Sequence, residues 1–271
     1  MKEPFVNIAV KAARAAGDII VRALDRLDRI KVSEKRPNDY VTEIDQLAEK
    51  EIIQVIRKAY PQHAILSEEC GVISGTSENE NEWIIDPLDG TRNFIHGFPH
   101  FAVSIAMRHK GRIEHGVIYD PIRQELFTAS RGKGASLNER RIRAAQHKTL
   151  KECLLGTGFP SSQNDPHRVS AYTRSLAALL PLSGDVRRAG AATLDLAYVA
   201  CGRLDGFWEM GLKPWDLSAG ALLIREAGGL VCDFSGGESW FESGNIVAGN
   251  PRILKLLLQQ LAPYLVESLE K

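Results

Sequence analysis

Residues 83–91 read Trp-Ile-Ile-Asp-Pro-Leu-Asp-Gly-Thr, and the fold can be worked out from this stretch. A short apolar run leads directly into two aspartates, which is typical of a buried strand that ends at a polar edge. Two other acidic stretches stand at similar places. Glu68-Glu69 follows the apolar run 64–66, and Trp215-Asp216 precedes the helical pattern of residues 217–227. Because α/β folds bind ligands where strands end and helices begin, we expect the three stretches to meet in one site.

Each acidic stretch also has a plain structural interpretation when it is taken alone. Asp86-Pro87 and Asp89-Gly90 are common turn dipeptides, and Asp216 suits the N-cap of a helix. If the fold brings these aspartates together with Glu68, the carboxylates share a small space and raise one another's pKa. A divalent cation resolves that conflict, and an oxygen-only ligand set favours Mg²⁺ over zinc. Taken together, the stretches predict a magnesium site.

The residues after Asp89 add a place for an anion. We expect a short helix to begin at Thr91 or Arg92, which leaves its first backbone N–H groups unpaired and its dipole positive. Such a helix end holds phosphate, and Gly90 lets the backbone approach a ligand closely. Metal ligands on one side and a phosphate cradle on the other predict metal-assisted phosphoryl chemistry.

The composition argues against several other classes of protein. The chain has 271 residues, with 34 Lys and Arg against 34 Asp and Glu, so it lacks the excess positive charge of strong intrinsic nucleic-acid binding. No segment reaches the roughly 18 apolar residues of a membrane span, and residues 1–5 lack a signal core. We therefore expect a cytoplasmic protein without membrane contact. The four cysteines form no C-x-x-C pair, which argues against a zinc site and a disulfide framework.

The first half of the chain combines helices with a meander. Residues 6–27 and 42–60 repeat apolar residues at helical spacing, and Asp45 completes a capping box with Thr42. Residues 101–144 alternate apolar strands with turn residues. This pattern predicts an antiparallel sheet and an α+β arrangement.

The second half, from about residue 151, alternates short apolar runs with helical ones, which is typical of an α/β arrangement. The expected strands are 153–155, 230–232 and 246–248, and the expected helices are 169–180, 194–200, 217–227 and 253–265. We expect residues 1–145 to carry the main metal site, and residues 146–271 to supply Asp216 and the substrate-recognition residues. No linker separates the halves, so they should share one core.

These motifs resemble the signatures of the inositol monophosphatase family, and in particular its bacterial extragenic-suppressor type. Residues 83–91 are similar to the first family signature, and residues 215–220 with 226–229 are similar to the second. Glu68-Glu69 matches the family's paired glutamates, and residues 39–45 match its D-x-V-T-x-x-D stretch. The resemblance covers nearly the whole chain and implies the layered αβαβα sandwich of the sugar phosphatases.

The resemblance implies two metal ions, both Mg²⁺, and a ligand set for each. Glu68, Asp86 and the carbonyl of Leu88 hold the first ion. Asp86, Asp89 and Asp216 hold the second. Asp86 therefore bridges the two ions.

The resemblance also assigns residues to the attacking water and to the substrate. Thr91 and Glu68 orient and deprotonate the water, and Asp45 lies behind the ligands or at a weak third metal. The amides of Gly90 and Thr91 hold the phosphate. Glu209 accepts a hydrogen bond from an inositol hydroxyl, beside a wall of small residues at 190–192. The substrate contacts implied in this way are Glu68, Leu88, Asp89, Gly90, Thr91, Arg187, Gly190, Ala191, Glu209 and Asp216.

Three positions depart from the family pattern without removing a ligand. Ser67 replaces a frequent glycine, Arg92 replaces a small residue, and Lys213-Pro214 precedes Trp215. Arg92 either adds positive charge near the phosphate or faces solvent.

The expected activity is Mg²⁺-dependent hydrolysis of myo-inositol 1-phosphate and related small phosphate monoesters. The resemblance implies a homodimer that lithium inhibits. Alternatives within the same fold are hydrolysis of fructose 1,6-bisphosphate, 3′-phosphoadenosine 5′-phosphate or histidinol phosphate. A different alternative is a non-catalytic partner of ribosomal RNA transcription antitermination factors. Arg187-Arg188 and the basic run 140–143 are the candidate contact surfaces for that role, unless they are simply solvated charges.

Overall fold

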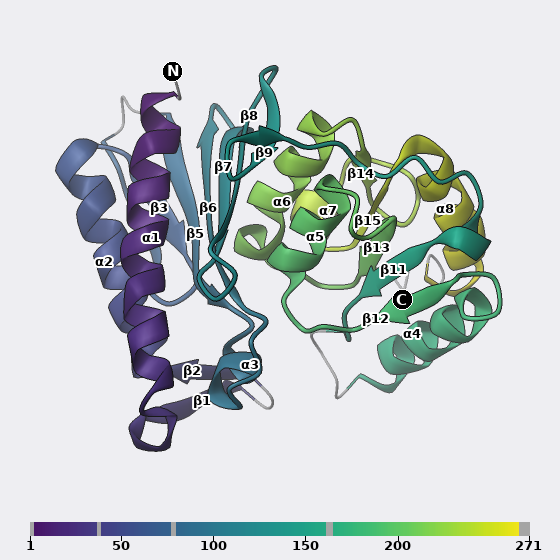
Figure 1. Cartoon of the computed structure of the whole chain (residues 1–271), viewed down its shortest axis with the longest axis horizontal. Coiled ribbons are helices and arrows are strands. Elements are labelled where there is room, and N and C mark those ends of the chain that lie inside the picture. The colour runs from purple at the N-terminus through teal and green to yellow at the C-terminus, as the bar shows by residue number, and fades with distance from the viewer. Residues whose placement is uncertain (1–2, 37–38, 77–79, 161–164, 266–271) are drawn as a thin grey trace.

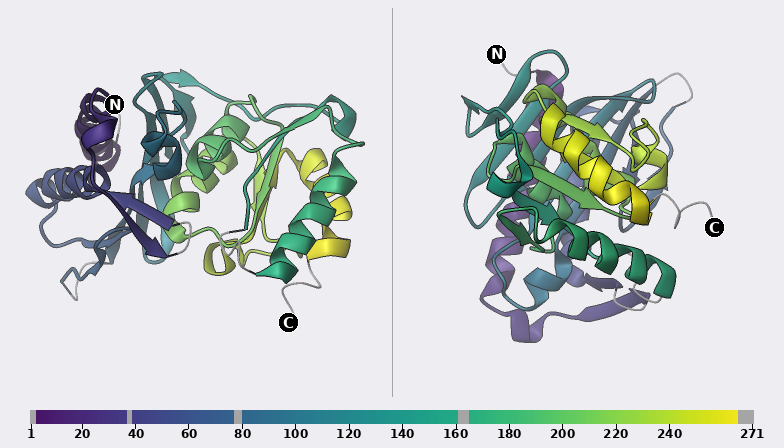
Figure 2. Two further views of the ribbon diagram at one scale, coloured as in Figure 1. Left: turned by 90° about the horizontal axis from the view of Figure 1, so that it is seen from below. Right: turned by 90° about the vertical axis from the view of Figure 1, so that its right-hand side faces the viewer.

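The computed structural model describes residues 3–36, 39–76, 80–160 and 165–265. Its elements form five layers in the order helix, sheet, helix, sheet, helix, as Figure 1 shows from one side and Figure 2 from two others. This arrangement confirms the expected αβαβα sandwich. Within the described ranges, no helix combines the length and the apolar character needed to cross a membrane.

The first layer consists of α1 (Pro4–Leu24) and α2 (Glu43–Ala59), which pack together on one face of an eight-stranded sheet. The predicted capping box is present at the start of α2. The Thr42 hydroxyl accepts from the Asp45 N–H, and the Asp45 carboxylate accepts from the Thr42 N–H. The first helix ends three residues earlier than expected, and a 3-10 turn, η1 (Leu27–Arg29), follows it.

The large sheet has the strand order β10-β9-β8-β7-β6-β5-β3-β4. Its strands are β3 (Ala64–Ser67), β4 (Gly71–Ile73), β5 (Asn81–Asp89), β6 (Ala102–His109), β7 (Arg112–Asp120), β8 (Glu125–Ser130), β9 (Gly134–Leu137) and β10 (Arg140–Arg141). The neighbours from β5 to β10 are antiparallel, which confirms the meander. In contrast, β3 is parallel to β5. The carboxyl ends of β3 and β5 therefore meet at one edge of the sheet.

One hairpin was missed by the sequence analysis. It consists of β1 (Val32–Arg36) and β2 (Asp39–Thr42) and lies beside the short helix α3 (Thr91–Ile95), near the bottom of Figure 1. The β1 sequence Val-Ser-Glu-Lys-Arg contains one apolar residue, so it lacks the alternation that predicts a half-buried strand.

The second half supplies the three remaining layers. The central helices α5 (Ala192–Ala200) and α6 (Pro214–Glu226) contact both sheets. The five-stranded sheet has the order β12-β11-β13-β15-β14, and α4 (Pro166–Leu179) and α8 (Pro251–Leu265) cover its outer face. The remaining elements are η2 (Leu150–Glu152), β11 (Leu154–Thr157), β12 (Asp185–Arg187), β13 (Gly206–Glu209), β14 (Leu230–Cys232), α7 (Trp240–Ser243) and β15 (Ile246–Gly249). The strands β12 and β13 were also missed.

The central strand β5 is buried on both faces, which explains its continuous apolar run. Trp83 and Ile85 belong to the core cluster beneath α1 and α2, whereas Ile84 belongs to the cluster that faces α5 and α6. The second cluster contains side chains from both sides of residue 145, as the absence of a linker led us to expect. With its apolar residues held from both sides, β5 delivers Asp86 at a fixed place.

Candidate active site

The aspartates of the central strand are placed by a bulge. Asp86 pairs with Ser104 of β6 and Asp89 pairs with Ala102, so β5 uses three steps where β6 uses two. In a regular strand, residues 86 and 89 would point to opposite faces. Asp86 has the same parity as Ile84, so its carboxylate already faces the central helices. The extra residue turns Asp89 to that side as well. Asp86 therefore lies within β5, which continues through Asp89, and not in a solvated turn; it is 1% exposed.

Hydrogen bonds hold each of the three aspartates. The Leu88 N–H donates to Asp86 Oδ1 at 3.0 Å. Asp89 Oδ2 accepts from the Thr193 N–H at 2.8 Å and from the Thr193 hydroxyl at 2.5 Å, which ties β5 to α5. Asp216 Oδ2 accepts from the Lys213 N–H at 2.7 Å. Asp216 is thus the third residue of α6, and Lys213 occupies the N-cap position that the plain interpretation gave to Asp216.

The predicted ligands lie close enough to affect one another's charge. Burial raises the pKa of Asp86 well above its ordinary value, and the negative charges of Glu68, Asp89 and Asp216 raise it further. Burial also raises the pKa of Asp89 to about 6, despite its bonds from Thr193. Burial and the Asp89 charge raise the pKa of Asp216 to about 7. The fold therefore brings together the four carboxylates that the sequence placed in one site.

This donor set fits a divalent cation of the Mg²⁺ type. All donors are oxygens, and the mutual repulsion of the carboxylates is what a cation relieves. In the described part of the chain, no three His, Cys, Asp or Glu side chains are already gathered tightly enough to hold a metal. Asp89 and Asp216 are instead turned toward Thr193 and Lys213. These bonds use Oδ2 of each aspartate.

Thr91 is joined to a buried carboxylate of the first layer. It begins α3, as expected, and Gly90 before it has a left-handed φ of 88°. The Thr91 hydroxyl lies 2.9 Å from Asp45 Oδ1 and 3.0 Å from the Leu88 carbonyl. Asp45 is fully buried, and burial raises the pKa of its carboxyl. The sequence analysis named both residues but did not predict a contact between them.

A cavity of about 120 Å³ opens beside Asp89 and Asp216. Its other lining residues are Thr157, Gly158, Arg188, Gly190, Ala191, Ala192, Asp195, Glu209 and Leu212. The cavity thus combines two predicted metal ligands with the predicted contacts Gly190, Ala191 and Glu209. Glu68, Asp86, Leu88, Gly90 and Thr91 are not part of its lining.

Arg187 is placed away from this cavity. Its guanidinium is exposed and pairs with Asp185 at 2.5 Å. The next residue, Arg188, lines the cavity, and its guanidinium carbon lies 4.4 Å from the centre of the Phe159 ring. Neighbouring residues of an extended segment point in opposite directions, so a shift of one position decides which arginine faces the site.

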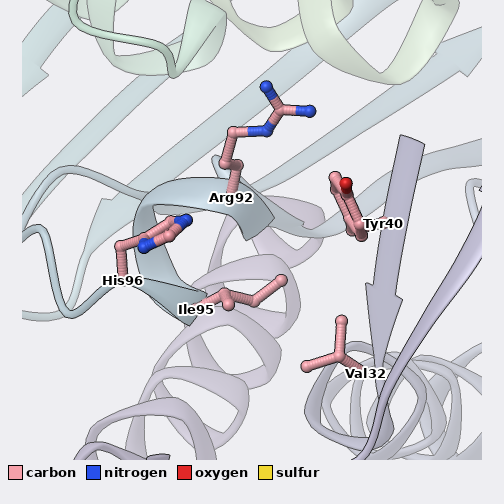
Figure 3. A pocket seen from close by; sticks show the side chains of 5 residues that line it. All are labelled: Val32, Tyr40, Arg92, Ile95 and His96. Carbon is pink, nitrogen blue, oxygen red and sulfur yellow. The ribbon is translucent and has the colours of Figure 1, made fainter. Parts of the chain in front are cut away.

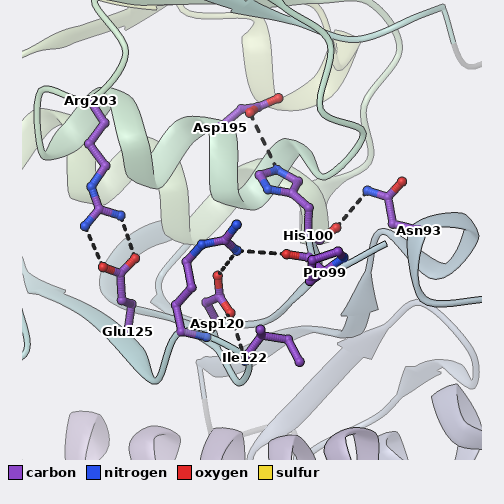
Figure 4. A network of polar contacts seen from close by, with 9 residues as sticks. Asn93, Pro99, His100, Asp120, Ile122, Glu125, Asp195 and Arg203 are labelled. Carbon is purple, nitrogen blue, oxygen red and sulfur yellow. Dashed lines mark hydrogen bonds and ion pairs between the residues drawn. The ribbon is translucent and has the colours of Figure 1, made fainter. Parts of the chain in front are cut away.

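Asp195 and Asn93 were missed by the sequence analysis. Asp195 is 2% exposed, and its Oδ1 lies 3.9 Å from Nε2 of His100. Asn93 Nδ2 donates to the His100 carbonyl at 2.7 Å, as Figure 4 shows. It also donates to the Ala189 carbonyl at 2.9 Å, and so joins α3 to the segment that carries Gly190 of the cavity wall. The available signal for Asp195 was a single acidic residue in the otherwise apolar helix 194–200.

A larger cavity of about 330 Å³ lies where α3 faces the hairpin of β1 and β2 (Figure 3). It is lined by Val32, Tyr40, Arg92, Ile95 and His96. Arg92 is exposed there, with its guanidinium carbon 5.1 Å from the centre of the Tyr40 ring. Because this cavity contains none of the clustered carboxylates, we place the site of chemistry at the smaller one.

Comparison with known proteins points to one family. A model of the inositol monophosphatase family matches residues 1–270. The chain is 55% identical over 270 residues to a Nus factor SuhB of Pseudomonas aeruginosa, covering 99% of this chain and 100% of that protein. It is also similar to the crystal structure of the extragenic suppressor protein SuhB from Bartonella henselae, with a TM-score of 0.92, 45% identity and coverage of 96% and 98% of the two chains.

A second solved structure is an inositol monophosphatase from Anabaena, with a TM-score of 0.85 and 40% identity over 97% of this chain and 98% of that one. The fold agrees with these matches. The chain therefore belongs to the inositol monophosphatase family, a family of phosphatases that use divalent metal ions.

Proposed function

We propose that this protein hydrolyses myo-inositol 1-phosphate and related small phosphate monoesters with Mg²⁺. The observation that carries the proposal is the mutual charge effect of Glu68, Asp86, Asp89 and Asp216, two of which line a cavity with Glu209. Mg²⁺ held by these carboxylates and the Leu88 carbonyl would polarise the phosphate and acidify water. The protein's own groups would supply positioning and proton transfer.

Thr91 and Asp45 would provide the path for the proton. The Thr91 hydroxyl donates to Asp45 Oδ1, which leaves the Thr91 oxygen free to accept a hydrogen bond from water. Glu68 is the second group that we assign to this water. A positioned acceptor of this kind contributes typically about a hundredfold or more to the rate.

The cavity suits a neutral, hydroxyl-rich group. Glu209 and Asp195 both line it, and a carboxyl accepts hydrogen bonds when ionised and donates one when protonated. Burial raises the pKa of each, and the charge of Asp195 further raises that of Glu209. Among the residues that line the cavity in the described structure, Arg188 is the single basic side chain. A second phosphate group, as in a bisphosphate or nucleotide, would need more positive charge.

The test is phosphate release from a substrate panel with Mg²⁺ and with EDTA. The panel contains myo-inositol 1-phosphate, fructose 1,6-bisphosphate, 3′-phosphoadenosine 5′-phosphate and histidinol phosphate. We expect Mg²⁺-dependent release that is fastest from inositol phosphate. No release from any of the four with Mg²⁺ present would refute the phosphatase proposal, whereas preference for another member would change only the substrate.

A second proposed role is non-catalytic, as a partner of transcription antitermination factors. It is favoured by the 55% identity to a protein named Nus factor SuhB over nearly the whole chain. The candidate contact residues are all exposed: Arg140, Arg141, Arg143, Arg187 and Arg188. Pulldown of purified transcription elongation factors with the wild type and with Asp86→Asn separates the two roles. We expect Asp86→Asn to abolish hydrolysis and to leave partner binding unchanged. Light scattering tests the homodimer that the family resemblance implies.

A further inference from the structure

Glu49, in the middle of α2, reaches the turn that carries Glu68. Its side chain is 5% exposed, and its Oε1 accepts from the Glu69 N–H at 3.0 Å and the Cys70 N–H at 3.2 Å. The Ser67 hydroxyl donates to the same oxygen. One buried carboxylate oxygen therefore receives donors from both sides of Glu68.

The backbone of Glu68 is fixed from a second direction. Its N–H donates to the Ile85 carbonyl of β5 at 3.2 Å. The turn is thus held between α2 and the strand that carries Asp86. Hydrogen bonds to an ionised carboxylate are about twice as strong as neutral ones, and breaking them leaves a buried charge without donors.

The same helix also holds Thr91. Asp45 and Glu49 are four residues apart, so they lie one above the other on the same face of α2. Asp45 accepts from the Thr91 hydroxyl, and Glu49 holds the turn of Glu68. As one rigid helix, α2 therefore sets the distance between Glu68 and Thr91, the two residues assigned to the attacking water.

Ser67 adds a side-chain donor to this arrangement. It stands where the family pattern frequently has glycine, which has no side-chain donor. The serine hydroxyl contacts Glu49 at the end of β3, one residue before Glu68. The departure noted in the sequence therefore has a structural counterpart.

We infer that Glu49 is a positioning residue that aligns Glu68 with Thr91 through α2, and that Ser67 reinforces it. The inference rests on the proposed function for its activity readout, but its first readout is Mg²⁺ affinity. Groups that support metal ligands typically contribute about 10–100-fold to metal affinity or activity.

The main experiment compares the wild type with Glu49→Gln by calorimetric titration with Mg²⁺ and by turnover of inositol phosphate. Glutamine keeps the shape and removes the charge. We expect the Mg²⁺ dissociation constant to rise and turnover to fall, each by about tenfold or more. Glu51→Gln is the matched control, because it makes the same chemical change on the same helix, outside these contacts. It should leave both quantities within about twofold.

Ser67→Ala tests the arrangement without touching the buried charge. We expect a smaller loss of Mg²⁺ affinity, about two- to fivefold, that disappears when Ser67→Ala is combined with Glu49→Gln. If Glu49→Gln does not fold, Glu49→Asp and Ser67→Ala carry the test alone. Both should weaken Mg²⁺ binding while the protein stays folded.

The outcomes separate the two proposals. A wild-type protein that neither binds Mg²⁺ nor releases phosphate would refute the proposed function. A wild type that does both, with Glu49→Gln at the same Mg²⁺ affinity and turnover, would overturn the inference alone. A lower melting temperature of metal-free Glu49→Gln with unchanged Mg²⁺ affinity would reduce Glu49 to a structural residue, which also overturns it.

Discussion

Asp45, Asp86 and Asp89 have the same side chain, yet each carboxyl meets different neighbours. Asp45 accepts from Thr42 and Thr91, Asp86 is surrounded by other acidic residues, and Asp89 is bonded by Thr193. Burial raises the pKa of all three. Their different neighbours are the reason why we propose proton transfer for Asp45 and metal binding for Asp86 and Asp89.

At the residue scale, Thr91→Val tests the proton path. Valine keeps the shape but removes the hydroxyl that donates to Asp45. We expect turnover of inositol phosphate to fall by roughly a hundredfold or more, while KM stays within a few-fold. Steady-state kinetics and a melting curve check this. The N-cap of α3 is Gly90, so loss of a helix cap is not expected; normal turnover with reduced stability would contradict the assignment.

Glu209→Gln tests polyol recognition. The side chain lines the cavity, and a lost hydrogen bond to a hydroxyl is worth on the order of 1 kcal/mol. We expect a several-fold loss of kcat/KM for inositol phosphate and almost none for glycerol 2-phosphate. Equal losses for both substrates would remove Glu209 from substrate recognition.

Elements bring these residues together by their ends. The parallel pair of β3 and β5 places Glu68 beside Asp86, and the bulge of β5 turns Asp89 to α5. The end of β11 supplies Gly158, which lies directly against the Glu209 carboxylate of β13. The site is therefore a junction of strand ends, and small changes in one element reach side chains of another.

At the element scale, Gly158→Ala should reproduce the effect of Glu209→Gln. A Cβ at this position would lie 2.0 Å from Glu209 Oε1, so the carboxylate must move. We expect the same selective loss for inositol phosphate in parallel kinetic assays. Combining Gly158→Ala with Glu209→Ala should relieve the collision and restore the melting temperature without restoring selectivity. A Gly158→Ala variant with wild-type selectivity would show that the displaced carboxylate is not needed.

The whole molecule keeps the acidic cluster between its two sheets. Side chains from both halves form the core cluster that includes α5 and α6. The proposed metal ligands therefore come together only when the layers are assembled. Stability of the fold and occupancy of the site are for this reason linked.

We expect Mg²⁺ to stabilise the molecule by mass action. At about 100 times the dissociation constant, the free energy of unfolding should increase by roughly 2.7 kcal/mol. Denaturant unfolding curves recorded with Mg²⁺ and with EDTA measure this increase. Asp86→Asn serves as the control, and its stability should respond little to Mg²⁺. A wild-type stability that does not change up to tens of millimolar Mg²⁺ would argue against the metal site.

Without metal, the contribution of the acidic cluster to stability should fall as pH rises from about 4 to about 7. The pKa values of Asp89 and Asp216 rise from 3.8 to about 6 and about 7, so the folded state holds their protons more tightly than the unfolded state. This stabilisation is complete below pH 3.8 and is lost as pH passes the folded values. Burial lowers the pKa of His63, His100 and His115, which has the opposite sign and acts up to about one unit above their ordinary value of 6.5, so the contribution of the cluster is measured as the difference between the wild type and Asp216→Asn.

Melting temperatures in EDTA across this pH range check the prediction. Asp216→Asn should flatten the slope, and excess Mg²⁺ should reverse the loss. Asp205 raises the pKa of His147, so this residue also makes stability fall as pH rises. Both proteins in the comparison retain His147, so its contribution is the same in each. An Asp216→Asn variant with an unchanged slope would contradict the assignment of the effect to the cluster.

The sequence alone determined the local features: the α2 capping box, the start of α3 and the meander. It placed the end of the central strand at residue 85, whereas β5 continues through Asp89. Each of the three local features depends on residues that are near one another in the chain, because helix capping and the spacing of apolar residues are local properties of the sequence. Only the tertiary structure decided that Arg188 and not Arg187 lines the cavity, that Asp45 holds Thr91, and that Glu49 holds the turn of Glu68. These contacts join segments from different layers, and no local period encodes which side chains will meet when the layers pack.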